Sequence, residues 1–475
     1  MLIKLFIFSQ FVFNDAVFAH SFDERYDLPI PFYLFIAGGG LVVALSFLLI
    51  SFSFWHAPIR EYEYGRHRYI VESKKVLQYL TWPLRIIGLI LFFFVIGAAF
   101  FGQDNPLLNL APNFIWIIWW LGLSLCIALF GNIWPLLDPW RSLYQILNGT
   151  TKIIGLKNGV NFNWTWPATF GVFPATVFLL AWSWLEVVYP IAFVPYRVGC
   201  LAMLWTGITI AGMVCFGQEV WLRNGDVFSI YFSLIGKFGI FSFNKNYQYV
   251  NIQYPSIGIL YFANCATRIQ GITAFIMAML STVIFDGLHG NQVWVVFERG
   301  LSYILFGWTD INGYYSGTLG LLAIWGIFYF AFYFSCYLST KITPKMKTAE
   351  LARYFSATFI PIAIAYLIAH NFSSLVIQGQ NIVYLISDPF LMGWNLFGTK
   401  EFRPNIAVID AGFMWYLAVG AIVLGHVIAV YLSHLLAMQL AGSGIKAMMM
   451  NIPQTVLMIA FTMLSLIIIA EPMLL

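Results

Sequence analysis

Residues 31–54 read PFYLFIAGGGLVVALSFLLISFSF, a run that contains no charged side chain. A helix rises about 1.5 Å per residue, so roughly 20 apolar residues are enough to cross the hydrocarbon core of a bilayer. Runs of the same kind recur along the chain, and together they predict ten transmembrane helices. We expect these spans near residues 31–54, 78–101, 113–136, 167–189, 198–217, 267–287, 317–341, 354–377, 411–435 and 453–472.

The composition of the whole chain agrees with this interpretation. Of the 475 residues, 61% are hydrophobic and only 9% are charged, and a soluble domain of this size could not bury so much apolar surface. No charged or Ser/Pro-rich linker separates two differently composed halves. We therefore predict an all-α fold, a polytopic transmembrane helix bundle of about ten spans, with residues 20–475 forming one transmembrane domain in the lipid bilayer.

The first residues have the pattern of a cleavable signal peptide. Lys4 supplies a positive charge, residues 5–12 form a short apolar segment, and Val17-Phe18-Ala19 satisfies the small-residue rule before a cleavage site. Removal of residues 1–19 would leave His20 as the first residue of the mature chain, on the outer side of the membrane.

The basic residues give an independent test of this orientation, because Lys and Arg accumulate in cytoplasmic loops. With the mature N-terminus outside, 17 of the 24 Lys and Arg residues fall in cytoplasmic loops or at the span ends beside them, and five fall outside. We expect both mature termini to lie outside. The net charge of +4 is thus distributed by membrane side, and a nucleic-acid partner is not expected.

Two predicted cytoplasmic segments share a pattern of Trp, then Asp, then Ser-x-Tyr. They begin at Trp134, after the third span, and at Trp221, after the fifth. Asp138 and Asp226 are suitable N-caps for short amphipathic helices on the membrane surface, where Trp and Tyr also sit favourably. We predict a capping role for both carboxylates.

Ionisable side chains at membrane depth are the strongest functional signal, because each is costly unless it faces a partner or a cavity. Asp286 and His289 have the i, i+3 spacing that places a carboxylate and an imidazole on one helix face. His370 lies on a helix that becomes polar toward its outer end, which is typical of a helix that lines water or a binding site, or that holds its neighbours by polar contacts. We expect Asp286 and His370 to approach each other in one solvent-open cavity near the outer surface. Other polar residues predicted on that side are Asp27, Glu186, Gln380, Asp388 and Asp410.

These residue types suit a divalent metal, copper or zinc, as well as acid and base chemistry. Asp286, His289 and His370 offer the nitrogen and oxygen donors of such metal sites. His20 would add a terminal amine and an imidazole, which can chelate a single copper ion through two nitrogens. The alternatives are therefore an enzyme with His370 and Asp286 as catalytic residues, a copper-binding protein centred on His20, and a small-molecule transporter or scaffold. For a transporter, the polar residues of the inner half are sparse.

Seven segments carry a family resemblance: HSFDERYDLPIP at 20–31, DPWR at 138–141, FDG at 285–287, AHNFS at 369–373, residues 378–390, WNLFGT at 394–399 and GHV at 425–427. They resemble bacterial membrane proteins of the fenitrothion hydrolase-like family. The resemblance implies an inner-membrane enzyme that hydrolyses an organophosphorus triester taken from the periplasm.

The chain also departs from what this family leads us to expect. After His434 it reads Leu-Leu-Ala-Met, where an acidic and a basic residue are expected. No zinc-hydrolase signature, nucleophile elbow or phosphate-binding loop occurs in the sequence. In such a hydrolase a bound metal would activate water and polarise the phosphoryl oxygen, with His370, Asp286 and His289 as ligands or base.

Overall fold

The computed structural model describes residues 31–53, 68–72, 76–155, 159–243, 249–306, 313–342, 344, 346–441 and 444–470. Within these ranges the chain is helical almost throughout, with one small sheet. The predicted all-α transmembrane bundle is confirmed, since long apolar helices recur along the whole described chain. The predicted signal peptide and His20 lie outside the described residues.

Nine helical segments in the described ranges are long and apolar enough to cross a membrane, and each coincides with one of the ten predicted spans. They are α2 (Phe32–Ser53), α3 (Val76–Phe101), Leu110–Phe130, α9 (Pro195–Phe216), α13 (Ile272–His289), α15 (Tyr314–Ile342), Thr348–Leu385, α19 (Ala411–Ala441) and α20 (Gly444–Ala470). Two of these segments are composite. The first joins α4 (Leu110–Pro112), the π-helix η3 (Asn113–Gly122) and α5 (Leu123–Phe130), and the second joins α16 (Thr348–Ser356), η6 (Ala357–Phe359), α17 (Ile360–Gln378), η7 (Gly379–Asn381) and α18 (Ile382–Leu385).

The remaining predicted span, residues 167–189, contains a shorter helix than expected. This helix, α8 (Phe173–Val187), has 15 residues and so extends about 22 Å, less than the hydrocarbon thickness of roughly 30 Å. Its start is set by Gly171, whose φ is +45°, and by Pro174 in the first turn. The residues just before it form turns, because a left-handed backbone conformation interrupts a helix.

The third predicted span also ends earlier than expected, at Phe130 instead of residue 136. Gly131 follows with φ +107°, and a Cβ atom at this position would lie 2.0 Å from the carbonyl oxygen of Phe241. Only glycine fits this backbone conformation and this close approach. The chain then turns into the short helix α6 (Trp134–Leu137).

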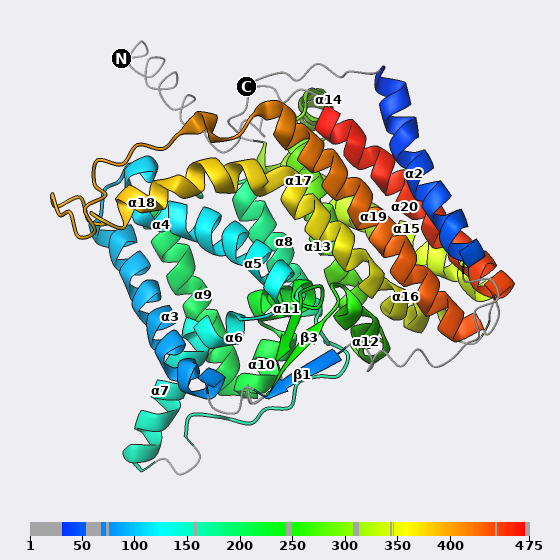
Figure 1. Cartoon of the computed structure of the whole chain (residues 1–475). Helices are drawn as coiled ribbons and strands as arrows, with labels where there is room; N and C mark the ends of the chain where they lie inside the picture. The colour runs from blue at the N-terminus through cyan, green and yellow to red at the C-terminus, as the bar shows by residue number, and fades with distance from the viewer. Residues whose placement is uncertain are drawn as a thin grey trace.

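Helices α13 and α17 lie at the centre of the bundle (Figure 1). α13 packs against α8, α15 and α17, while α17 also packs against α19 and η3. On one side of this centre α2, α15, α19 and α20 pack together, and on the other side α3 packs against α9. Any side chain directed inward from α8, α13 or α17 therefore meets neighbours from another of these helices.

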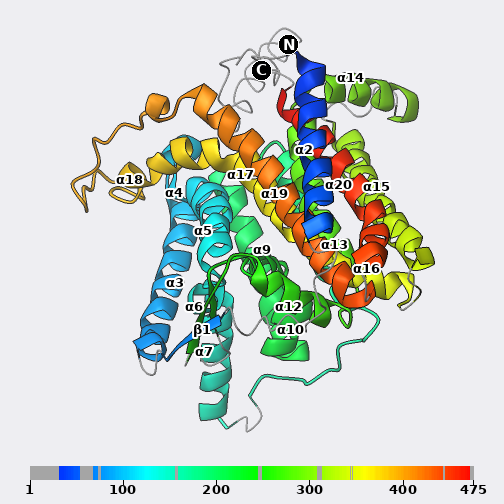
Figure 2. The ribbon, with the colours of Figure 1, turned by 45° about the vertical axis from the view of Figure 1, so that its right-hand side comes forward.

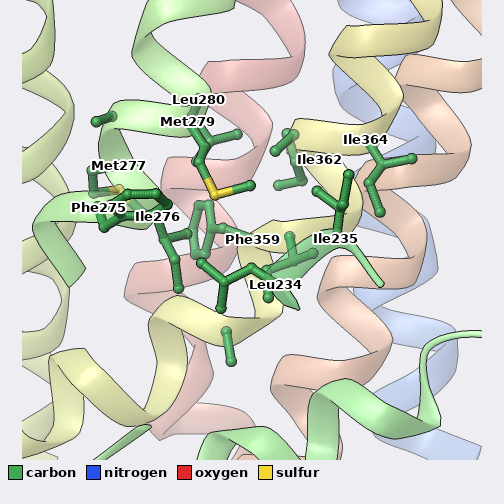
Figure 3. Packing of buried hydrophobic residues seen from close by; sticks show 14 of the residues in the cluster. Leu234, Ile235, Phe275, Ile276, Met277, Met279, Leu280, Phe359, Ile362 and Ile364 are labelled. Atoms are coloured by element: carbon green, nitrogen blue, oxygen red, sulfur yellow. The ribbon is translucent and has the colours of Figure 1, made fainter. Parts of the chain in front are cut away.

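One part of the apolar core lies where α11 meets the central helices. The short helix α11 (Val227–Ile235) ends in Leu234 and Ile235, which lie together with Phe275 of α13 and Phe359 of η6 (Figure 3). All four side chains are almost completely buried. Within a bilayer such contacts stabilise by close packing rather than by removing apolar surface from water. The cluster joins helices that are distant in the sequence.

The short elements gather at the two ends of the bundle (Figures 1 and 2). α14 (Gln292–Leu301) and α18 lie at one end, and α7 (Pro139–Ile153), α10 (Gln218–Asn224) and α12 (Ile257–Ala266) lie at the other. The start of α2 and the end of α20 both lie at the α14 end. This grouping agrees with the division into outer and cytoplasmic segments, while the orientation in the membrane stays a prediction.

One small sheet joins two of the predicted cytoplasmic segments and was not expected from the sequence. β1 (Arg68–Glu72), β3 (Tyr249–Gln253) and β2 (Phe241–Phe243) form an antiparallel sheet in the order β1-β3-β2. The register places Arg68 opposite Gln253 and Phe241 opposite Ile252. The sheet thus connects the segment after the first span to the segment before α12.

The predicted capping roles of Asp138 and Asp226 are confirmed. The prediction of an amphipathic surface helix after Asp226 was wrong, because seven of the nine residues of α11 are buried in the bundle. Asp138 accepts hydrogen bonds from the backbone N–H groups of Trp140 and Arg141 at the start of α7, and Asp226 accepts one from Ser229 in α11, at 3.0 Å. Both residues are almost fully buried, with 1% and 0% of their surfaces exposed. Burial raises the pKa of Asp138 to about 6, against the opposing effect of Arg141. Burial and then the charge of Asp138 raise the pKa of Asp226 to about 7.

Candidate functional site

Asp286 and His370 form a direct pair between the two central helices. Nε2 of His370, on α17, lies 2.8 Å from Oδ2 of Asp286, on α13. The side chains are 10% and 15% exposed, respectively. The predicted approach of these two side chains is confirmed, while the predicted solvent-open cavity around them and its place on the outer side stay predictions. At this distance the carboxylate stabilises the protonated form of the imidazole.

Two neighbouring contacts position this pair. Tyr366, one helical turn before His370, donates a hydrogen bond to the carbonyl oxygen of Phe461 in α20 at 3.3 Å, and its hydroxyl also bonds to Ser465. Gly287 follows Asp286, and a Cβ atom there would lie 2.9 Å from a methyl carbon of Ile468 and 3.6 Å from Cε1 of His370. The helix continues through this glycine to its end, so Gly287 permits close packing rather than ending α13.

A third ionisable group, Glu186, belongs to the same region. It lies one residue before the end of α8, and its carboxyl group accepts a hydrogen bond from the indole of Trp120. Asp286 is close enough for its charge to act on Glu186. The sequence placed Glu186 on the outer side but did not connect it to the pair, because pairing between α8 and α13 has no signature in residue spacing.

His289, which was predicted as a metal ligand, lies beside α14. Its ring centroid is 5.5 Å from that of Phe285 and 6.2 Å from that of Trp294. The charges of Glu298 and Asp286 act on it, and Glu298 also accepts a hydrogen bond from Ser316 at 3.0 Å. His289 thus shares the charge environment of the pair, while its ring packs on aromatic side chains.

Metal-ligating residues do not gather in threes within the described ranges. No group of three or more His, Cys, Asp and Glu side chains there could hold a metal ion. Asp286 and His370 supply two donors that bond to each other. His20 lies outside the described residues, so its part in a copper site stays a prediction.

Three other outer residues singled out in the sequence shape the backbone. Asp388 accepts hydrogen bonds from the N–H groups of Met392 and Gly393, and Asp410 caps the start of α19 by accepting one from Phe413. Gln380 holds the chain at Asn405, whose N–H donates to Oε1 at 2.9 Å and whose carbonyl oxygen accepts from Nε2 at 3.0 Å. These residues fold the segment between α18 and α19.

Replacing Gln380 with alanine is expected to loosen residues 386–410. The two lost hydrogen bonds to Asn405 contribute on the order of 1 kcal/mol each, so local opening should become about thirtyfold more frequent. Trypsin cleavage after the exposed Lys400, followed by mass spectrometry, measures this opening. Gln103→Ala removes an exposed glutamine from another outer segment and should leave the cleavage rate unchanged. Equal rates in the two variants would show that the bonds to Asn405 do not restrain the segment.

The Gly425-His426 segment, which carried part of the family resemblance, serves helix packing. His426 is fully buried, and its Nδ1 lies 2.8 Å from the carbonyl oxygen of Ile422 in the same helix. A Cβ atom at Gly425 would lie 2.4 Å from Cβ of Ala365, so glycine allows α19 to approach α17. A role of these two residues in positioning α17, and with it His370, follows from this contact.

Comparison with protein-family models, with curated proteins and with solved structures finds no match to this chain. The fenitrothion hydrolase-like resemblance therefore rests on the quoted segments. The structure establishes a multi-pass bundle of apolar helices with an Asp–His pair between its central helices. This pair is the candidate site for acid and base chemistry.

Proposed function

We propose that this chain is a membrane-embedded hydrolase in which His370, oriented by Asp286, activates a water molecule. The observation that carries the proposal is the 2.8 Å contact between His370 Nε2 and Asp286 Oδ2 in a sheltered site. A carboxylate at this distance stabilises the imidazolium that forms when the ring takes a proton, so the imidazole can act as a general base toward water.

The family resemblance suggests the substrate class, a neutral organophosphorus triester. In the proposed reaction, water gives one proton to the imidazole of His370 while its oxygen forms a bond to phosphorus. The bond from phosphorus to the leaving-group oxygen breaks, and the imidazolium then returns the proton to that oxygen. Asp286 stabilises the imidazolium between these two steps.

The proposed location on the outer face follows from the charge-derived topology, which places Asp286, His370 and Glu186 on the periplasmic side of the inner membrane. A neutral triester could reach this site from the periplasm or from the bilayer. The test is hydrolysis of a chromogenic aryl phosphotriester by the purified full-length protein in detergent. Absence of turnover under conditions in which the protein stays folded would refute the proposal.

Treatment with a chelator tests whether a metal takes part. Within the described residues no three metal-ligating side chains lie together, so we expect turnover by His370 to survive a chelator. Turnover that is lost on chelation and regained with zinc or copper would instead assign the reactive water to a bound metal. Elemental analysis of the purified protein accompanies the assay. Acetylation of the N-terminal amine tests the copper alternative, because it abolishes a copper site that uses the amine of His20.

A further inference from the structure

A polar cavity lies between α13, α15 and α16, at the end of the bundle that the charge distribution predicts to be cytoplasmic (Figure 1). Its volume is about 270 Å³, which is smaller than most pockets for drug-sized molecules. The cavity therefore suits a small polar group. Neither Asp286 nor His370 lines it, so the proposed hydrolysis does not use it.

Arg353 of α16 gives this cavity a positive charge. Its Nε donates a hydrogen bond to the carbonyl oxygen of Thr267 at 2.7 Å, and its Nη1 donates one to Oε1 of Gln270 at 3.3 Å. These two bonds fix the guanidinium group at the cavity wall. Because Arg353 is partly exposed, its remaining N–H groups are accessible to a ligand.

The rest of the polar wall also favours an anion. Tyr329 and Tyr333 line the cavity with hydroxyl groups that can donate hydrogen bonds, and their rings stack with centroids 6.2 Å apart. The first turn of α13, which contains no acidic residue, borders the cavity at Gly271 and adds the partial positive charge of a helix N-terminus. Among the described residues, no Asp or Glu lines the cavity. The complementary ligand is an anion that accepts several hydrogen bonds.

The cavity opens beside an apolar face of α15. Phe330 lines it and is 69% exposed, and Ile327 and Phe334 follow the same face of the helix and are exposed as well. This face belongs to a helix that is long and apolar enough to cross the membrane. An acyl chain can pack along it while the headgroup of the same molecule reaches Arg353.

We propose that this cavity binds the phosphate group of an anionic phospholipid. Arginine and phosphate form strong, charge-assisted hydrogen bonds, and the acyl chains lie against the exposed face of α15. A phospholipid with a choline headgroup fits less well, because its ammonium group meets the charge of Arg353 and no carboxylate. Two further basic residues near this end, Arg268 and Lys347, are exposed and attract an anionic lipid surface. The inference does not depend on the proposed hydrolase function.

The test is native mass spectrometry of the purified full-length protein in detergent, titrated separately with phosphatidylglycerol and with phosphatidylcholine of the same acyl chains. We expect one phosphatidylglycerol molecule per chain to bind at least about tenfold more tightly than phosphatidylcholine. Inorganic phosphate, which has no acyl chain, should not displace it. Equal binding of the two lipids would overturn the proposal. Displacement by an equimolar amount of inorganic phosphate would also overturn it, because the cavity would then bind a soluble anion.

Variants locate the site. Arg353→Gln removes the charge and should weaken phosphatidylglycerol binding about tenfold or more, while Arg353→Lys keeps the charge and should retain part of the affinity. Ala349→Phe leaves every charge in place and puts a ring at an exposed position of the cavity wall, so it should also abolish tight binding. Arg268→Gln is the matched control, because Arg268 is an exposed arginine that does not line the cavity. An equal loss in the Arg268 variant, or full binding in the Ala349 variant, contradicts this location.

Discussion

Replacing His370 with alanine is expected to lower kcat/KM for an aryl phosphotriester by a factor of about 10²–10⁴ while leaving membrane insertion intact. The imidazole is the group that activates water in the proposed reaction, and a positioned acid or base typically contributes this much. Initial rates of chromogenic leaving-group release, measured at equal concentrations of folded protein, give the factor. Full hydrolysis in the His370→Ala protein would refute the proposed site.

Asp286→Asn provides the matched variant for this experiment. The carboxamide can still accept a hydrogen bond from Nε2 of His370, so the local packing between α13 and α17 is retained. It does not stabilise the imidazolium as a carboxylate does, and we expect a clear loss of kcat with little change in KM. A variant that only loosened the fold would instead lower the thermal unfolding temperature, which the same samples can report.

Replacing Asp226 with asparagine is expected to stabilise the protein above pH 7 and to change little below pH 4. The folded pKa of Asp226 is about 7 and its ordinary value is 3.8, so the folded state keeps a proton that the unfolded state releases between these values. The contribution of Asp226 to stability is therefore complete at low pH and falls as the pH rises to 7. A difference of three pKa units corresponds to up to about 4 kcal/mol.

Asparagine avoids this loss because it carries no charge and is as good an N-cap as aspartate. It can still accept the hydrogen bond from the N–H of Ser229. Thermal unfolding of the purified protein between pH 4 and pH 9 gives the comparison. Asp104→Asn, at an exposed position, should follow the wild-type curve. Parallel curves for the wild type and Asp226→Asn would show that Asp226 is ionised throughout this range.

The sequence predicted the helical segments well because the bilayer imposes a simple rule. A chain in hydrocarbon has to satisfy its backbone hydrogen bonds within each span, so length and apolarity alone reveal a helix such as α2 or α20. The observed helices differ from the predicted spans where the backbone conformation of a single glycine shortens or ends a helix. Gly171 and Gly131 adopt positive φ values that shorten α8 and end α5, and hydropathy does not report backbone dihedral angles.

The caps and the central pair were also predictable, for two different reasons. Asp138 and Asp226 act on backbone groups two or three residues ahead, so sequence alone is enough to predict the cap. Asp286 and His370 are 84 residues apart in the chain, and their approach followed from the cost of an isolated ionisable group in a membrane. That argument led to the prediction that these two residues approach each other, and the packing of α13 against α17 brings them to 2.8 Å.

Sequence alone therefore determined which segments cross the membrane and which residues cap their neighbours, because these depend on contacts within a few residues. Tertiary structure alone decided that Glu186 joins the Asp286 region and that Gln380 holds the backbone at Asn405. These contacts join residues that are 25 or more positions apart in the chain. Residue spacing carries no record of them, because they depend on how helices and loops that are distant in the sequence pack together.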